Sequence, residues 1–344
     1  MRLEAVAAAL MLLGMGPVLA GPKRVLYVTH SAGFRHDSIP ASQQVLEELG
    51  VRSGLLQVVS TEDLSFISAD RLRDYDALFF FTSGELALSD QQKSDLLAFV
   101  RNGKGFGGVH SATDTLYSWP EYGQLIGGYF DGHPWAQSVR IDVEDPDHPS
   151  MQGLAPSFEI FDEIYQIRDF ARERERVLMT LDTRSVDLTN DGVHRTDGDF
   201  ALAWCHSYGA GRVFYTALGH PESTWRDARF QSMMLNALLW LTGQVSGNAS
   251  PRAGNPSIAS GGVGDAVYVG QGLAAGSLIS IYGSNLTTGS TLASADAMPR
   301  PVKLAGTMVL ADGVALPLLY VSPAQVNAQL PADLTPGATV RLQV

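Results

Sequence analysis

The segment KRVLYVTH, residues 23–30, is a short run of apolar and β-branched residues that ends in a polar side chain. The same pattern returns at 55–60, 76–82 and 105–110, with stretches of helical character between these runs. Strands that are apolar on both faces and alternate with helices are typical of a parallel sheet covered by helices. The sequence therefore predicts an α/β domain with a parallel sheet and flanking helices.

Two of the helices between these strands have recognisable ends. Pro40 stands where the first turn of a helix accepts proline, which has no backbone N–H to donate. Ser89 precedes a second helix, and Gly103 follows its last residues. The order strand, helix, strand, helix supports the parallel sheet.

The later part of this domain is more irregular. We predict further strands at 137–143, 159–167, 177–181, 200–206 and 212–218. An amphipathic helix at 227–241 closes the domain, which we place at residues 23–243.

A second, smaller domain follows. Residues 244–262 are rich in Gly, Ser, Asn and Pro, a composition typical of a flexible linker. Residues 263–344 contain short alternating stretches separated by Gly or Pro, which predicts a small all-β sandwich. Because the sequence stops within a stretch of strand character, we expect this β domain to be incomplete.

The first twenty residues have the composition of a secretory signal peptide. An apolar run at 5–16 follows Arg2, and small or aliphatic residues lead to a cleavage point after Ala20. An uncleaved membrane anchor is the alternative, although the run is short for a bilayer-spanning helix. We find no later segment that could cross a membrane, and expect a secreted or periplasmic protein.

Charge and motifs exclude several classes of partner. The formal net charge of −12 disfavours nucleic acid and anionic membranes as partners. No Gly-rich phosphate loop is present, so a nucleotide cofactor is not expected. Cys205 is the single cysteine, so no internal disulfide can form, and its apolar surroundings predict a buried, inert thiol. A small neutral ligand such as a sugar fits these limits.

Polar residues follow the predicted parallel strands. In an open α/β sheet, ligands bind beyond the carboxyl ends of the strands, so these residues are expected to border one crevice. A single histidine there is usually structural, whereas several together favour acid/base or metal-ligand work. The residues are His30, His36, Glu85, His110, Asp114, His220 and Glu222.

The segment GGVHSA at 107–112 predicts a strand followed by a sharp turn. Small residues on both sides permit a strained turn that projects His110 into the crevice. Ser111 leaves a serine hydrolase as an alternative, which the projecting position of His110 disfavours. Zinc-ligand spacings are absent, but separate strand ends can still assemble a divalent metal site, for which the candidates are His30, His110 and His220.

Two further segments supply candidates. In FDEIY, residues 161–165, alternation places Asp162 and Glu163 on opposite faces of a strand, and we favour Glu163 as the functional carboxylate. Aromatic residues near polar groups suit sugar stacking, with core packing as the other interpretation. They are Trp119, Tyr122, Tyr129, Phe130 and Trp135.

Five ordered blocks resemble the ThuA-like (trehalose utilisation) family across residues 23–243. They are HSAGFRHDSI at 30–39, GGVHSATD at 107–114, GGYFDGHPW at 127–135, FDEIYQI at 161–167 and GRVFYTALGH at 211–220. The resemblance implies a fold similar to class I glutamine amidotransferases. Their nucleophilic cysteine is replaced here by His110, so amidotransferase activity is not expected. The resemblance to the ThuA-like family also implies a role in the utilisation of trehalose or related disaccharides through 3-keto-sugar intermediates.

The β domain resembles a sandwich module at the carboxyl end of exported acidobacterial proteins. The matching stretches are GSLISIYGSNL at 276–286 and LPLLYVSPAQVNAQLP at 316–331. The resemblance implies a structural or adhesive appendage, and the partner of this domain stays open.

We interpret the chain as an enzyme, an isomerase, lyase or hydrolase, acting on a keto-sugar or glycoside. The predicted catalytic residues are His110, His133, Glu163, His30 and His220. The predicted substrate-binding residues are His36, Glu85, Asp114, Trp119, Tyr129, Trp135, Tyr165 and Glu222. The alternative is a non-catalytic carbohydrate-binding protein. The density of histidines and carboxylates favours the enzyme, because binding a neutral sugar does not need groups that titrate near neutral pH.

Overall fold

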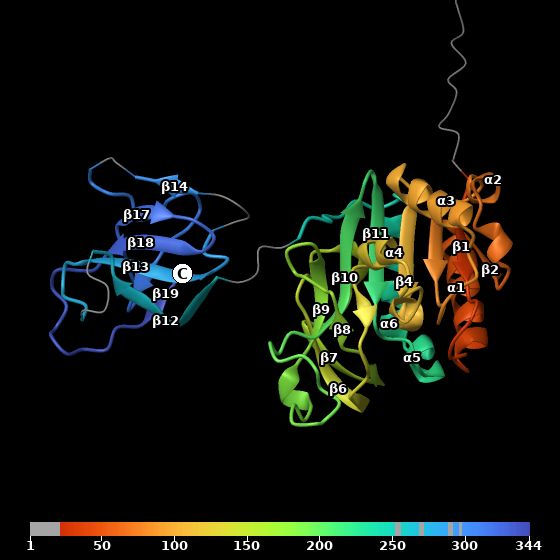
Figure 1. Cartoon of the computed structure of the whole chain (residues 1–344), viewed down its shortest axis with the longest axis horizontal. Helices are drawn as coiled ribbons and strands as arrows, with labels where there is room; N and C mark the ends of the chain where they lie inside the picture. The colour runs from red at the N-terminus through yellow and green to blue at the C-terminus, as the bar shows by residue number, and fades with distance from the viewer. Residues whose placement is uncertain (1–20, 252–255, 268–271, 288–291, 296–297) are drawn as a thin grey trace, which may run out of the picture.

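A computed structural model of the chain describes residues 21–251, 256–267, 272–287, 292–295 and 298–344 (Figure 1). The predicted signal peptide lies outside the described residues. Two separate hydrophobic clusters divide the described residues into an α/β domain and a β domain.

The α/β domain is built on a nine-stranded sheet of order β2-β1-β3-β4-β11-β10-β9-β6-β7. The first five strands of this order pair in parallel. These are β2 (Leu56–Thr61), β1 (Lys23–Val28), β3 (Ala77–Phe80), β4 (Gly105–Val109) and β11 (Gly211–Thr216). The predicted parallel sheet with flanking helices is confirmed for this half of the domain.

The other half of the sheet is antiparallel, which the sequence did not indicate. It contains β10 (Ala201–Tyr208), β9 (Arg176–Leu181), β6 (Trp135–Val143) and β7 (Ser157–Ile164). The connection between β10 and β11 is only Gly209 and Ala210, too short for the crossover that parallel neighbours need. A small ribbon of β5 (Tyr129–Phe130) and β8 (Ile167–Arg168) lies outside the main sheet.

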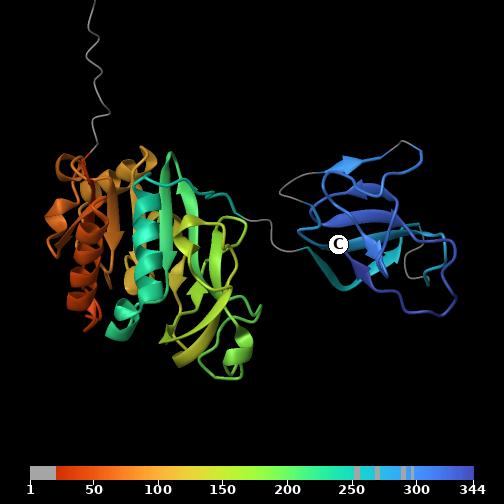
Figure 2. The ribbon, with the colours of Figure 1, turned by 180° about the vertical axis from the view of Figure 1, so that it is seen from behind.

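Helices cover both faces of the sheet. The longer ones are α1 (Ile39–Ser53), α3 (Asp90–Arg101) and α6 (Ala228–Leu241), and the shorter ones are α2 (Ala69–Leu72), α4 (Pro120–Ile126) and α5 (Glu222–Arg226). Helices α1 and α6 lie on one face (Figure 2), and α3 and α4 lie on the other (Figure 1). Short 3-10 turns are η1 (Leu64–Phe66), η2 (His110–Thr113), η3 (Pro149–Met151) and η4 (Thr183–Ser185).

The predicted helix ends are where the sequence placed them. Pro40 lies in the first turn of α1. Ser89 caps α3, because its hydroxyl accepts the backbone N–H of Gln92 while the Gln92 side chain accepts the backbone N–H of Ser89.

The start of the predicted linker packs against the α/β domain. Val245 and Ala249 contact the main hydrophobic core. Arg176 donates to the Ser250 carbonyl at 3.1 Å, and Trp240 donates to the Gly247 carbonyl at 3.3 Å. Residues 244–250 therefore belong to the α/β domain, and β12 (Ser257–Asp265) begins inside the range predicted as a linker.

The β domain is antiparallel. Its main sheet has the order β12-β13-β18-β17-β14, with β13 (Leu278–Ser284), β18 (Gln325–Gln329), β17 (Leu318–Val321) and β14 (Ala293–Ser294). A second sheet pairs β16 (Val314–Ala315), β15 (Leu310–Ala311) and β19 (Leu342–Gln343).

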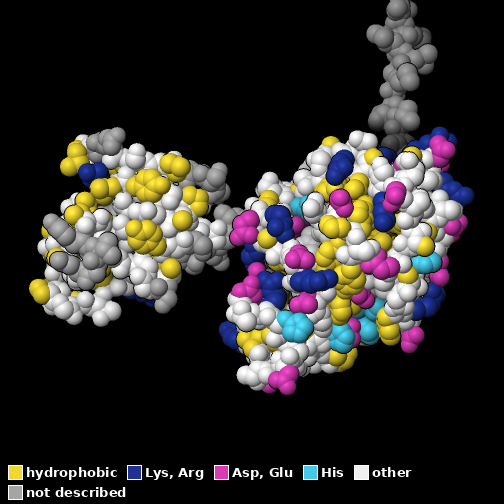
Figure 3. Space-filling view, in the orientation of Figure 1, with side chains coloured by type: hydrophobic (Ala, Val, Ile, Leu, Met, Phe, Trp, Pro, Cys, Tyr) yellow, Lys and Arg dark blue, Asp and Glu magenta, His cyan; other side chains and the backbone are white. Residues whose placement is uncertain are grey.

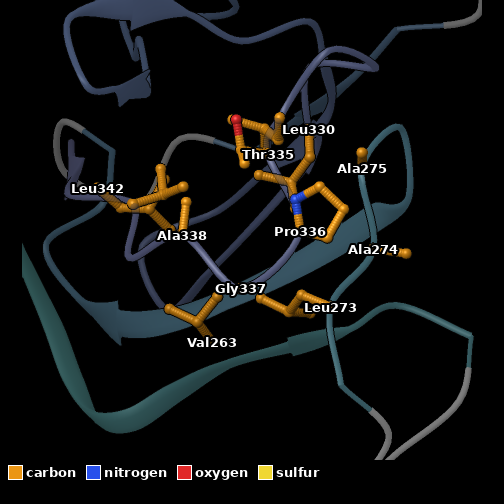
Figure 4. Close-up of a pocket in the computed structure, with 12 residues that line it drawn as sticks. Val263, Leu273, Ala274, Ala275, Leu330, Thr335, Pro336, Gly337, Ala338 and Leu342 are labelled. Atoms are coloured by element: carbon orange, nitrogen blue, oxygen red, sulfur yellow. The ribbon is translucent and has the colours of Figure 1, made fainter.

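A cavity of about 640 Å³ lies in the β domain, near Val263, Leu330 and Pro336 (Figure 4). Thr335 contributes the one polar side chain among its lining residues, which include no titratable group. This lining therefore offers no acid or base for catalysis. Within the described part of the chain, no helix is long and apolar enough to span a bilayer.

Candidate functional site

The candidate site lies at the carboxyl ends of the parallel strands. His36 follows β1, His110 follows β4 and His220 follows β11. Figure 3 shows histidine side chains gathered at the end of the α/β domain toward which these strands point in Figure 1. These histidines therefore lie at the edge of the sheet where ligands bind in open α/β folds.

His110 is fully buried, and its position depends on a strained turn. Its backbone has φ +48°, a left-handed conformation that costs energy for a residue with a side chain. Its Nδ1 lies 2.8 Å from the carbonyl oxygen of Ala217, which can only accept, so Nδ1 carries a proton. The Nε2 atom faces the site, 2.9 Å from the Tyr165 hydroxyl and 3.1 Å from His220 Nδ1.

Glu163 lies at the centre of the site, because three imidazoles surround its carboxylate. Its Oε2 is 3.1 Å from His220 Nδ1 and 3.5 Å from His110 Nε2, and its Oε1 is 3.3 Å from His133 Nδ1. Burial alone would raise the pKa of Glu163, but the imidazoles of His110 and His220 beside its carboxylate outweigh burial and lower it. The hydrogen bond with Glu163 in turn raises the pKa of His220. Glu163 is therefore an ionised carboxylate.

Asp162, on the opposite face of β7, holds the loop that carries His220. Its side chain is fully buried and accepts the backbone N–H groups of Gly219 at 2.8 Å and His220 at 3.0 Å. It also accepts the Thr224 hydroxyl at 2.9 Å. Burial raises the pKa of Asp162. Of the two carboxylates, Glu163 is the one predicted to be functional and the one that contacts the imidazoles, whereas Asp162 positions the loop that carries His220.

His36 completes a cluster of three imidazoles. Its ring centroid lies 4.8 Å from that of His110 and 5.0 Å from that of His220. Burial, with further repulsion from His110 and His220, lowers the pKa of His36 to about 3, so its ring is neutral at physiological pH. Phe34 and Phe81 flank the ring with centroids at 4.8 Å and 5.2 Å.

A close approach of two glycines fixes the loop that carries His36. Gly84 has φ +75°, and a Cβ atom there would lie 2.5 Å from the backbone nitrogen of Gly33. The Ser83 hydroxyl donates to the Phe34 carbonyl at 2.6 Å. The loops after β1 and β3 are therefore joined directly beside the cluster.

Four predicted site residues have partners outside the cluster. His30 bonds to the Glu62 carbonyl at 2.9 Å, and Asp114 accepts the Tyr117 hydroxyl at 2.7 Å. Glu85 accepts both the backbone N–H and the hydroxyl of Ser118, and Glu222 pairs with Arg226 on the surface of α5. Among the described residues, none of these four side chains forms a hydrogen bond or ion pair with His110 or Glu163.

The predicted sugar-stacking aromatics are mostly core residues. Trp119, Tyr129 and Trp135 are 7%, 7% and 3% exposed. The Tyr129 hydroxyl donates to the Trp119 carbonyl and the Trp135 indole to the Asp187 carbonyl. Tyr122 is fully buried, with its hydroxyl on the Ala112 carbonyl. These rings do not present an open face to a ligand.

Two aromatic rings border the site, Phe130, which is among the predicted aromatics, and Phe34, which is not. Phe34 is 63% exposed and stacks on His220 with centroids 6.5 Å apart. Phe130 stacks on His133 at 5.8 Å and contacts Tyr165 at 4.3 Å. The position of Phe34 within the polar loop HSAGFRHD was a usable signal in the sequence for an aromatic residue at the site.

The two alternative nucleophiles are buried, and His148, whose Nε2 lies 3.6 Å from Cys205 Sγ, is a buried imidazole whose pKa burial lowers to about 4. The Ser111 hydroxyl is 1% exposed and has no hydrogen-bond partner among the described residues. Cys205 lies in β10, and burial raises the pKa of its thiol well above the usual value. Neither group is placed for nucleophilic attack.

Comparisons with known proteins agree with this architecture. Residues 24–241 match the family model ThuA, described as trehalose utilisation. A ThuA-like protein from Bacteroides uniformis is 22% identical, with a TM-score of 0.56 over 64% of this chain and 92% of that chain. A ThuA-like protein from Parabacteroides merdae is 20% identical, with a TM-score of 0.52 over 67% of this chain and 94% of that chain. Curated protein sequences gave no significant match. Because the family model covers more than half of the chain, this protein belongs to the ThuA trehalose-utilisation family.

Proposed function

We propose that the α/β domain is an enzyme that moves a proton beside the carbonyl of a keto-sugar, in the utilisation of trehalose or a related disaccharide. The observation that carries the proposal is the contact of one ionised carboxylate, Glu163, with the three imidazoles of His110, His133 and His220. The family to which the chain belongs supports a carbohydrate substrate. We also propose that residues 1–20 export the protein.

His133 is the group best placed to act as the base. Its side chain is 49% exposed, whereas that of His110 is fully buried. With Nδ1–H donated to the Glu163 carboxylate, the lone pair of a neutral His133 is on Nε2. An imidazole supported by a carboxylate is an effective general base near neutral pH.

His220 is placed to stabilise the negative charge that proton removal creates. Its side chain is 34% exposed, and the carboxylate of Glu163 favours its protonated form. A cation held beside the substrate oxygen stabilises an enolate. Return of the proton to the former carbonyl carbon of the enediolate moves the carbonyl to the neighbouring carbon, which is isomerisation. Expulsion of a glycosidic oxygen from the next carbon, with protonation of that leaving oxygen, gives elimination.

Phe34 and Phe130 supply apolar faces on which a sugar ring can pack, since Phe34 is exposed and both stack on site histidines. The binding-protein alternative relied on Trp119, Tyr129 and Trp135, whose burial weakens it. The imidazoles around Glu163 favour the enzyme.

The test is proton exchange of 3-keto-trehalose in D₂O, followed by NMR with the full chain. We expect the protein to speed exchange beside the carbonyl, and Glu163→Gln and His133→Gln to slow it by about 100-fold or more. Glu159→Gln is the control, because Glu159 is an exposed glutamate four residues earlier on the same strand. Binding of the keto-sugar without exchange would overturn the proposal in favour of a binding protein. Loss of exchange in Glu159→Gln equal to that in Glu163→Gln would also contradict it.

A further inference from the structure

The three imidazoles of His36, His110 and His220 each direct one nitrogen into a common space. One ligand-capable atom from each lies within 4.8 Å of the other two. Each histidine comes from a different strand end, so the three residues form no short sequence motif.

Their spacing is close to that of a metal site. Two nitrogens bound tetrahedrally to Zn²⁺ at about 2.1 Å lie about 3.4 Å apart. His110 Nε2 and His220 Nδ1 are already 3.1 Å apart. His36 would need to approach by at most about 1.4 Å to reach the same spacing.

The protonation of His110 is that of a metal ligand. Metal-bound histidines usually donate their second N–H to a carbonyl or carboxylate, which fixes the ring and leaves the other nitrogen free to bind. His110 makes this contact through Nδ1 with the Ala217 carbonyl at 2.8 Å. Its Nε2 atom, directed at the cluster, is the one that a metal would use.

Acidic groups around the cluster can balance a cation and fix its ligands. Glu163 Oε2 lies 3.1 Å from His220 Nδ1 and 3.5 Å from His110 Nε2, beside two of the three ligand atoms. The buried carboxylate of Asp162 holds the backbone of His220 and leaves the imidazole free. The apolar rings of Phe34 and Phe81 contact His36 and limit the access of water.

We propose that His36, His110 and His220 bind one divalent transition-metal ion, with Glu163 beside it. Imidazole ligands select zinc and similar ions over magnesium or calcium, which prefer oxygen. Three protein ligands leave a position open for water or a substrate oxygen, as in catalytic zinc sites. The ligand set differs from that expected from the sequence, because His36 replaces His30.

The proposal concerns the same site as the proposed function: a bound ion would take the place of the proton on His220 and supply the positive charge that stabilises the enolate. Its test contains no sugar. Zinc binding without proton exchange of the keto-sugar would contradict the proposed function and support the metal site. Proton exchange without zinc binding would contradict the metal site and support the proposed function.

The experiment is calorimetric titration of the chelator-treated full chain with Zn²⁺. We expect one ion per chain, and binding at least about tenfold weaker in His36→Ala. His30→Ala is the matched control and should bind as the wild type does, since His30 bonds to the Glu62 carbonyl. The absence of stoichiometric binding by the wild type, or equal binding by His36→Ala, would overturn the proposal.

A second readout separates ligand loss from misfolding. Zinc should raise the midpoint of thermal unfolding in the wild type and in His30→Ala, because an ion that binds only the folded state stabilises it. The same addition should raise the midpoint of His36→Ala by less than that of the wild type, because the variant binds zinc more weakly. If His36→Ala does not fold, His220→Ala takes its place in both measurements, and a zinc response of the folded variant equal to that of the wild type would contradict the site.

Discussion

Neighbouring carboxylates on β7 perform different tasks because alternate residues of a strand face opposite sides. Glu163 meets three imidazoles, while Asp162 faces the loop after β11 and accepts the backbone N–H groups of Gly219 and His220. Substitution of either residue should disturb the site, but only loss of Asp162 should also destabilise the fold strongly.

The first prediction concerns Asp162→Asn. Asp162 accepts hydrogen bonds from Gly219, His220 and Thr224 with both of its carboxylate oxygens. In Asn one of these oxygens becomes an amide nitrogen, which cannot accept, so at least one buried donor loses its partner. We expect the free energy of unfolding to fall by about 3 kcal/mol, measured by urea denaturation.

Asp147→Asn is the control for this substitution, because Asp147 is an exposed aspartate in a loop. Its unfolding free energy should stay within about 0.5 kcal/mol of the wild type. An equal effect of the two substitutions would show that Asp162 does not hold the loop.

Among the structural elements, the loops after β1 and β3 depend on one close backbone contact. A Cβ atom on Gly84 would overlap Gly33, and Gly84 has φ +75°. The contact lies in the loop that places His36 beside His110, so this packing controls the geometry of the imidazole cluster.

The second prediction compares Gly84→Ala with Gly54→Ala. Both glycines have positive φ, but an added Cβ on Gly54, at the end of α1, would meet nothing within 4 Å. Gly54→Ala should cost about 1 kcal/mol from backbone strain alone. Gly84→Ala should cost about 3 kcal/mol or more, because the overlap adds to the same strain.

Thermal and urea unfolding of the two variants measure this difference directly. Weaker binding of zinc is also expected in Gly84→Ala and not in Gly54→Ala. Similar unfolding midpoints for the two variants would show that the overlap of the added Cβ with Gly33 does not destabilise the fold.

For the whole molecule, the α/β domain ends later than its composition suggests. Residues 244–250 contribute Val245 and Ala249 to the core and the Ser250 carbonyl to Arg176. The β domain has its own hydrophobic cluster around Ile279, Leu318 and Val326.

The third prediction compares chains that comprise residues 21–250 and 21–243. The longer one should unfold cooperatively with the midpoint of the intact α/β domain, because its core is complete. The shorter one should lose about 2 kcal/mol from the missing hydrogen bonds and apolar contacts. Identical urea midpoints would place the boundary at residue 243, as composition alone suggests.

The sequence by itself determined the elements of the fold. Apolar runs such as 23–30 and 105–110 become parallel strands, and the helix signals at Pro40 and Ser89 become helix ends, because these features depend on neighbouring residues. The strand-end rule selected His110 and His220, and the alternation of FDEIY selected Glu163, three side chains that lie in contact in the structure. Composition did not reveal the antiparallel half of the sheet, since strand direction depends on which distant strands pair.

Only the tertiary structure decided which histidines meet. His30 and His36 lie in one loop and have the same chemistry, yet His36 packs against His110 and His220, while His30 bonds to Glu62. The difference follows from the contact between Gly33 and Gly84, which joins loops far apart in the sequence. Burial likewise separated core aromatics such as Trp135 from the exposed Phe34, because exposure depends on which elements pack over a side chain.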